Sequence, residues 1–234
     1  MHSDMDTHET IVMSVGGSLI VPDGIDTTFL QNLKSFIETE TAAGRRFIII
    51  AGGGRTARNY QDAAASVAAL EAEDLDWMGI HATRLNGHLL RTVFRDIAHL
   101  EMITNPDDIL DVPKSAQVII AAGYRPGSST DLRAVQIASH VGARKMINLS
   151  NIDYVYTADP KQDDTAEKIE TISWADFRKL IRTEWDPGLS SPFDPIAAKE
   201  ADEKDIEVAI INGNKMEELT NYLHGKEFIG TKIA

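Results

Sequence analysis

The sequence predicts an α/β protein, a three-layer α/β/α sandwich around a mainly parallel sheet. Two observations predict this class. Short apolar runs rich in Ile and Val end mostly at Gly, Asn or Ser, as buried parallel strands do. Amphipathic stretches stand between these runs, and strands that alternate with helices build a parallel sheet with both faces covered.

The strands predicted from these runs span residues 10–15, 46–50, 117–122, 145–149 and 207–211. The helices predicted from apolar periodicity span residues 28–44, 84–99, 132–143 and 215–225. The turn-rich segment 185–195 is predicted to be a lobe boundary or a substrate loop. We expect residues 1–10 to form a flexible N-terminal segment and residues 11–234 to form a single domain.

Composition narrows the classes of function. The 234 residues carry a formal net charge of −13, which argues against a sequence-independent nucleic-acid binder because such binding needs a cationic surface. The absence of cysteine excludes disulfides, thiolate metal sites and a Cys nucleophile. No leader-like segment is visible, and no apolar run approaches the ~20 residues that cross a bilayer. We therefore expect a cytoplasmic protein with no membrane partner.

Polar and glycine-rich segments follow the predicted strands. These are "GGS" from residue 16, "GGG" from 52, "GYRPGSSTD" from 123 and "LSNIDYVYTADP" from 149. Ligands of open parallel sheets bind beyond the carboxyl ends of the strands, so these segments are expected to face one cleft. Glycine turns that lead into helices can cradle an anion with backbone N–H groups, although a simple tight turn explains each of them equally well.

Each candidate residue also has an ordinary structural explanation. Arg58 lies one helical turn beyond Gly54 and could reach a phosphate, whereas Arg55 is expected to be a surface arginine. Ser129 or Thr130 could cap the helix that follows, and Asp131 could simply complement its dipole. Histidines and carboxylates do not occur at metal-site spacing, so no protein metal site is predicted.

Taken together and in this order, several segments resemble the amino acid kinase superfamily, and most closely its archaeal-type uridylate kinases. The likeness runs from about residue 11 to the C-terminus. Its motifs are "GGSLIVPDGID", "GGGRTARNYQDAA", "DWMGIHATRLNGHLL", "GYRPGSSTDLRAVQIA", "NIDYVYTADPKQDDTAEKI", "PFDPIAAKEA" and "GTKI". The resemblance implies the amino acid kinase fold, a homohexamer, and transfer of a phosphoryl group from ATP to UMP with Mg²⁺.

The resemblance also implies roles for individual residues. On the ATP side it implies Gly17, Ser18, Gly54, Arg58, Ser150, Asn151, Tyr156 and Asp159. On the UMP side it implies Gly53, Asp76 as the ribose contact, and the loop of Tyr124, Arg125, Pro126, Gly127, Ser128, Ser129 and Thr130. Arg58 and Asp131 are the predicted catalytic residues.

The chain departs from the family pattern at a few positions. Many members carry a lysine where this sequence has Ser14, which makes Arg58 the first candidate for the missing cation and Lys161 a weaker one. Tyr154 stands in place of a family glycine, and Tyr124 and Arg125 replace smaller residues. Two alternatives stay open: a kinase of another small phosphate or carboxylate, and a non-catalytic storage or nucleotide-sensing relative.

Overall fold

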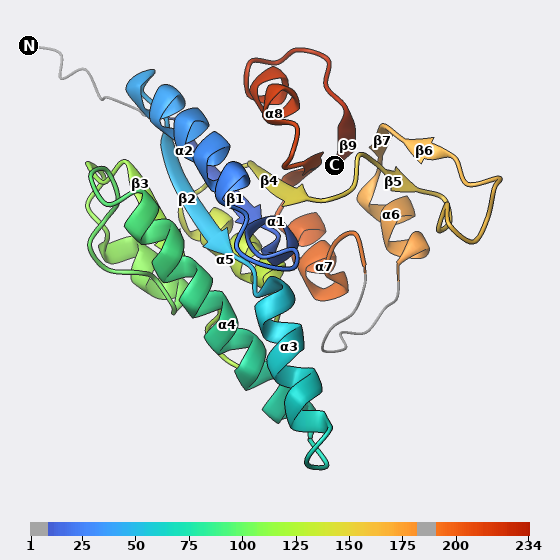
Figure 1. Ribbon diagram of the computed structural model, residues 1–234. Coiled ribbons are helices and arrows are strands. Elements are labelled where there is room, and N and C mark those ends of the chain that lie inside the picture. The colour runs from blue at the N-terminus through green and yellow to red at the C-terminus, as the bar shows by residue number, and fades with distance from the viewer. Residues whose placement is uncertain (1–8, 182–190) are drawn as a thin grey trace, which may run out of the picture.

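The computed structural model describes residues 9–181 and 191–234, and its centre is a seven-stranded sheet in the order β3-β2-β1-β4-β8-β9-β7 (Figure 1). The strands are β1 (Thr10–Val15), β2 (Arg46–Ala51), β3 (Val118–Ala121), β4 (Lys145–Ser150), β7 (Thr171–Ile172), β8 (Glu207–Asn212) and β9 (Gly230–Ile233). Neighbouring strands of this described sheet are parallel except β8 and β9. The prediction of a mainly parallel sheet is therefore confirmed. A separate antiparallel pair joins β5 (Val155–Tyr156) to β6 (Lys168–Ile169).

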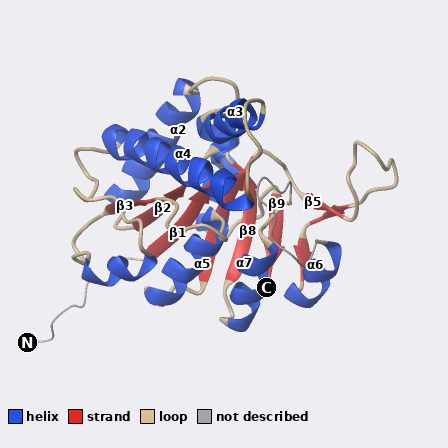
Figure 2. Cartoon of the chain, turned by 90° about the horizontal axis from the view of Figure 1, so that it is seen from below, coloured by secondary structure: helices blue, strands red, loops and turns tan. Residues whose placement is uncertain are grey.

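Helices cover both faces of the sheet, as Figure 2 shows. One face packs on α1 (Gly17–Ile20), α2 (Thr27–Ala42), α4 (Ala72–Val93) and α8 (Met216–Leu223). The other packs on α5 (Thr130–His140), α6 (Trp174–Leu180), α7 (Pro195–Glu203) and the 3₁₀ helix η1 (Pro106–Asp111). Side chains of each strand alternate between the two cores: in β2, Phe47 and Ile49 enter the first, and Ile48 and Ile50 enter the second. The predicted sandwich is confirmed.

The predicted strands agree with the observed ones to within one residue at each end. The helix predicted for 84–99 instead begins at Ala72 and ends at Val93, because its first turns are mostly exposed and carry no apolar stripe. Apolar periodicity did not predict helix α3 (Gly54–Ala65), since Ala57 is its one buried residue. Most of the predicted lobe boundary or substrate loop at 185–195 lies outside the described residues. Thr10 already pairs with Arg46, so ordered structure begins before residue 11.

The parallel strands bring their carboxyl ends to one edge of the sheet. Helices α1, α3 and α5 begin there, directly after β1, β2 and the loop that follows β3. Helices α3 and α4 pack against each other and extend beyond this edge (Figure 1). The two glycine loops and the loop after β3 therefore meet where the sheet, α3 and α4 come together, whereas the segment that follows β4 starts at this edge and continues to β5.

Candidate functional site

Two glycine loops pack backbone against backbone at the carboxyl ends of β1 and β2. The amide of Gly52 donates to the carbonyl of Val15 at 2.9 Å, which ties the second loop to the end of β1. A Cβ at Gly17 would overlap the backbone of Gly54, and a Cβ at Gly54, whose φ is +61°, would overlap Gly17. Glycine is therefore required at these two positions by the packing of the loops, before any ligand is considered.

Gly53 differs from its neighbour. It caps α3 with a φ of −80°, so its backbone conformation is open to any residue. A Cβ there would still lie 2.9 Å from Cβ of Ala57, which leaves no room for a branched side chain. Substitution of Gly53 would thus disturb the loop as well as any ligand contact.

A buried asparagine on α4 holds the triple-glycine loop in place. The Nδ2 of Asn86 donates to the carbonyls of Gly52 at 2.8 Å and Gly53 at 3.1 Å, and the side chain is 3% exposed. These bonds turn the carbonyls toward α4. The sequence alone predicts no role for Asn86, because its partners lie more than thirty residues away in the sequence.

The same helix anchors the start of the loop at residues 124–130, called the acceptor loop below. Oγ1 of Thr83 accepts from the amide of Gly123 at 2.8 Å. Arg84 donates from Nε to the carbonyl of Gly123 at 3.1 Å and from Nη2 to that of Tyr124 at 3.0 Å. Helix α4, which also holds the triple-glycine loop, thus fixes the start of the acceptor loop.

Asp76 lies on α4 and reaches the acceptor loop directly. Its Oδ2 accepts from the amide of Gly127 at 2.6 Å. Asp76 is not a helix cap, because α4 begins at Ala72 and its cap is Glu71, which forms a capping box with Asp74. The structure therefore places the predicted ribose contact beside the predicted substrate loop.

The N-terminus of α5 closes the acceptor loop. Oγ of Ser129 accepts from the amide of Leu132 at 3.1 Å, so Ser129 is the helix cap, as the capping alternative expected. Thr130 is the first helical residue. Arg125 is exposed, and its guanidinium carbon lies 5.6 Å from the centroid of the Tyr124 ring. The predicted UMP residues of this loop form one continuous surface segment.

A group of polar side chains surrounds Asp131 at the end of β1. Oδ1 of Asp131 accepts from Oγ of Ser14 and from Nδ2 of Asn148, both at 2.9 Å. The pKa of Asp131 is raised to about 6: burial of the carboxyl is the largest cause and the nearby Asp194 carboxylate adds to it, while the hydrogen bonds from Ser14 and Asn148 oppose the shift. Burial also raises the pKa of Asp194, whose Oδ2 has no hydrogen-bond partner in the described part of the chain.

Ser14 therefore occupies the position of the family's lysine and donates a hydroxyl hydrogen bond to Asp131. On α3, Arg58 is exposed, and its side chain has no hydrogen-bond or ion-pair partner within residues 9–181 and 191–234. Arg55 is exposed and lies 3.9 Å from Asp23, as expected for a surface arginine. Of these two arginines, Arg58 is the one whose guanidinium group has no partner in the described part of the chain.

The predicted ATP residues follow β4. Ser150 ends that strand, its carbonyl accepts from Gly213, and Asn151 is exposed just beyond it. Tyr156 lies in β5, opposite Lys168. Asp159 accepts from the amide of Lys161 and from Nε2 of Gln162, both at 3.0 Å, so its carboxylate stabilises its own turn. The hydrogen bonds of the described residues connect neither Tyr156 nor Asp159 to the glycine loops.

Tyr154 and its neighbour Asp153 are held to other parts of this end of the molecule. Nζ of Lys168 lies 4.9 Å from the centroid of the Tyr154 ring. Asp153 accepts from Nδ2 of Asn212 at 2.7 Å and from Nζ of Lys215 at 2.8 Å, and the Lys215 hydrogen bond lowers the pKa of Asp153. These contacts fix the segment that carries the predicted ATP residues to β8 and α8.

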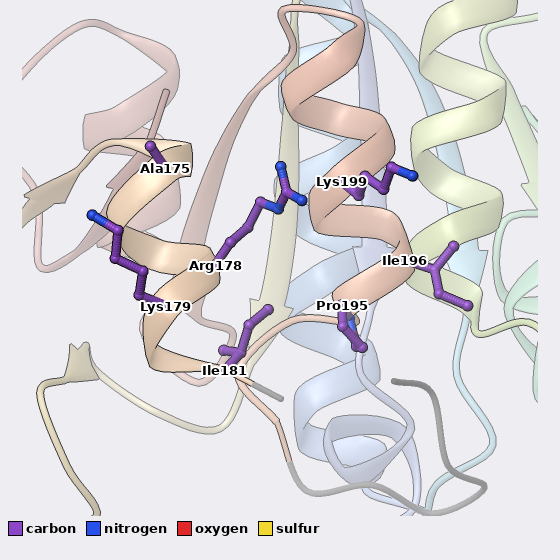
Figure 3. Close-up of a pocket in the computed structure, with 7 residues that line it drawn as sticks. All are labelled: Ala175, Arg178, Lys179, Ile181, Pro195, Ile196 and Lys199. Atoms are coloured by element: carbon purple, nitrogen blue, oxygen red, sulfur yellow. The ribbon is translucent and has the colours of Figure 1, made fainter. Parts of the chain in front are cut away.

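A hollow of about 630 Å³ lies elsewhere, between α6 and α7 (Figure 3). Its three cations are already paired, Arg178 with Asp202, Lys179 with Asp176 and Lys199 with Glu203. We therefore do not assign it to the site. Within the described ranges, no group of three or more His, Asp or Glu side chains is arranged to hold a metal ion. None of the helices there is long and apolar enough to cross a bilayer.

Glycine loops, a free arginine and a helix N-terminus gathered at one edge of a parallel sheet are the parts of a phosphate-handling α/β protein. The amino acid kinase family model matches residues 9–212, and the chain belongs to the amino acid kinase family.

Within this family the chain is similar to proteins named uridylate kinase. It is 33% identical over 228 residues to the one from Methanospirillum hungatei, a match that covers 96% of this chain and 94% of the relative. It is 30% identical over 226 residues to that of Hyperthermus butylicus, covering 96% and 97%. The crystal structure of the Archaeoglobus fulgidus uridylate kinase matches with a TM-score of 0.79 at 27% identity, covering 97% of this chain and all of that one. The resemblance read from the motifs is confirmed.

Proposed function

We propose that the protein is a uridylate kinase, which transfers the γ-phosphoryl group of ATP to UMP and releases ADP and UDP. The observation that carries this proposal is the attachment of the acceptor loop to α4. Thr83, Arg84 and Asp76 hold the segment 123–127 beside the glycine loops, so a nucleotide in the acceptor loop would present its phosphate at their edge. The full-length similarity to proteins named uridylate kinase supports the same reaction.

We propose that the donor nucleotide lies across the ends of β1 and β4. Gly17 and Ser18 would contact its phosphates, with Gly54 beside them. The segment from Ser150 through Asn151 to Tyr156 and Asp159 would line the rest of this site. Magnesium would enter as the MgATP substrate, because Mg²⁺ is commonly held by phosphate oxygens, water and few protein groups.

The reaction needs little covalent chemistry from the protein. A phosphate oxygen of UMP attacks the γ-phosphorus in line, and the bond to the oxygen that bridges the β- and γ-phosphates breaks. The attacking oxygen is already deprotonated, so no general base is required. Arg58, whose guanidinium is free, would neutralise charge on the transferring group. Asp131 would position the end of β1 through Ser14.

We further propose that the protein acts as a homohexamer in the cytoplasm. Exposed apolar side chains on α3 and α4 support an interface there: Tyr60 is 68% exposed, Leu85 63% and Trp77 39%. Light scattering coupled to size exclusion tests this assembly, and a monomer at micromolar concentration would contradict it.

The function is tested by coupled ADP release with MgATP and a panel of UMP, CMP, dUMP and isopentenyl phosphate. We expect UMP to give the highest kcat/KM. Preference for another acceptor would contradict the assignment of UMP as the substrate. A kinase of another small phosphate would then be the first alternative function. Nucleotide binding without turnover of any acceptor would instead point to a storage or sensing relative. Ser14 supplies no positive charge where many family members have a lysine, so the assay must include this outcome.

A further inference from the structure

A buried arginine lies beneath the acceptor loop and has no carboxylate partner within residues 9–181 and 191–234. Arg133, on the first turns of α5, is 4% exposed. No carboxylate of the described chain lies within ion-pairing distance of Arg133. Glu200 interacts with it only through a weaker electrostatic attraction over a longer distance. Its Nε is buried without a hydrogen-bond partner among those same residues. A buried cation with one N–H unsatisfied is unfavourable and calls for a compensating anion.

The contacts of Arg133 point to the acceptor loop. Its Nη2 donates to Oγ of Ser128, and its Nη1 donates to Oε1 of Gln136 at 2.6 Å. Its guanidinium carbon lies 5.3 Å from the centroid of the Tyr124 ring, within the range of a cation–π contact. Arg133 therefore touches the loop near its beginning and again near its end.

Two arginine side chains place positive charge around the acceptor loop, whereas the net charge of the whole chain is negative. The chain carries a net charge of −13, yet the acceptor loop has Arg125 on its surface and Arg133 beneath it, and both lie near the Tyr124 ring. The charge of Arg125 also acts unfavourably on Arg133. Two like charges held around one loop are stabilised by an anion that binds this loop.

We propose that Arg133 is a positioning residue for the phosphate of the acceptor nucleotide. It holds Ser128 and Tyr124 in the binding conformation and supplies positive charge from below the loop, without touching the nucleotide. This inference rests on the proposed function, since it assumes that the loop binds a nucleoside monophosphate. The compensating charge that Arg133 lacks is the dianionic phosphate of that ligand.

The test is to measure binding of UMP and of uridine, which lacks the phosphate, by calorimetry in the Arg133→Met variant. We expect the Kd for UMP to rise roughly tenfold, as when one favourable charge near the phosphate is removed without loss of a direct contact, with the Kd for uridine changed less than about twofold. The melting temperature of the ligand-free variant should stay the same or rise, because an uncompensated buried charge is removed. A purely structural role would lower the melting temperature and weaken both ligands equally.

Two further variants keep the test decisive. Arg144→Met makes the same change at an exposed arginine beyond the other end of α5, and should leave both Kd values unchanged. Arg133→Lys keeps the charge but loses the two-pronged contact with Ser128 and Gln136, so we expect an intermediate Kd for UMP. If Arg133→Met fails to fold, Arg133→Lys must show the loss for UMP alone.

An unchanged ratio of the UMP and uridine Kd values in the substituted proteins would overturn the proposal. That failure is distinct from failure of the proposed function. In the first case the wild-type protein still phosphorylates UMP, and its KM for UMP is unaffected by Arg133→Lys. In the second case the wild-type protein does not phosphorylate UMP at all.

Discussion

Replacing Asp131 with Asn should change how the stability of the protein depends on pH. The pKa of Asp131 is raised from 3.8 to about 6, mainly by burial. The folded state therefore binds this proton more tightly than the unfolded chain does, and the free energy of unfolding falls as the pH rises from about 4 to about 6. A rise of about two pKa units corresponds to at most ~3 kcal/mol of stabilisation of the folded state, and this stabilisation is fully lost above pH 6.

The structure also shows which hydrogen bonds the Asp131→Asn side chain would retain. Ser14 and Asn148 both donate to Oδ1 of Asp131, and Oδ1 of an asparagine can accept the same two bonds. Its Nδ2 would face the backbone of Asp194, which now donates to the carboxylate, and a mismatch of this kind costs roughly 1–3 kcal/mol. We therefore expect Asp131→Asn to be about 0–2 kcal/mol more stable than wild type at pH 7.5 and less stable near pH 4.5.

The assay is urea unfolding at several pH values between 4.5 and 7.5. Asp176→Asn is the matched control: Asp176 is exposed, and its hydrogen bonds with Lys179 and Ser173 lower its pKa, so its contribution is constant across this range. Unfolding free energies of wild type and Asp131→Asn that change in parallel with pH would refute the reasoning.

The remaining predictions concern the loops and the nucleotides. Arg58→Ala should lower kcat about a hundredfold or more while the Kd for UMP changes little, since its free guanidinium acts on the transition state; an effect on KM alone would make Arg58 a ground-state anchor. Asp76→Ala should lower kcat/KM for UMP about tenfold and for dUMP less, because a ribose hydroxyl bond to a carboxylate is lost; an equal loss for both would contradict the ribose contact. Asn86→Leu should destabilise the fold by about 1–3 kcal/mol, because two loop carbonyls lose their donor; a urea midpoint equal to that of wild type would show that the donor is not needed.

Much of the fold was determined by local sequence. Strands β1, β2, β3, β4 and β8 were predictable because each is a short run rich in Ile and Val, and both faces of a central parallel strand are buried. The glycine loops and the order of motifs pointed to the correct family. The periodicity did not reveal α3, which buries only Ala57, or the exposed start of α4, which has no apolar stripe. The short elements β7, β9, α6 and α7 were also not predicted.

The internal organisation of the site was decided by tertiary structure. Ser14 and Asp131 are 117 positions apart, and Asp76 and Gly127 are 51 apart, so neither hydrogen bond leaves a trace in local spacing. The sequence alone could not show that Gly17 and Gly54 need each other's space, or that Arg133 is buried beneath a loop that it clamps. Hydrophobic periodicity records which face of an element is buried, whereas polar partners are chosen by the way distant elements pack, and only the folded chain brings those partners together.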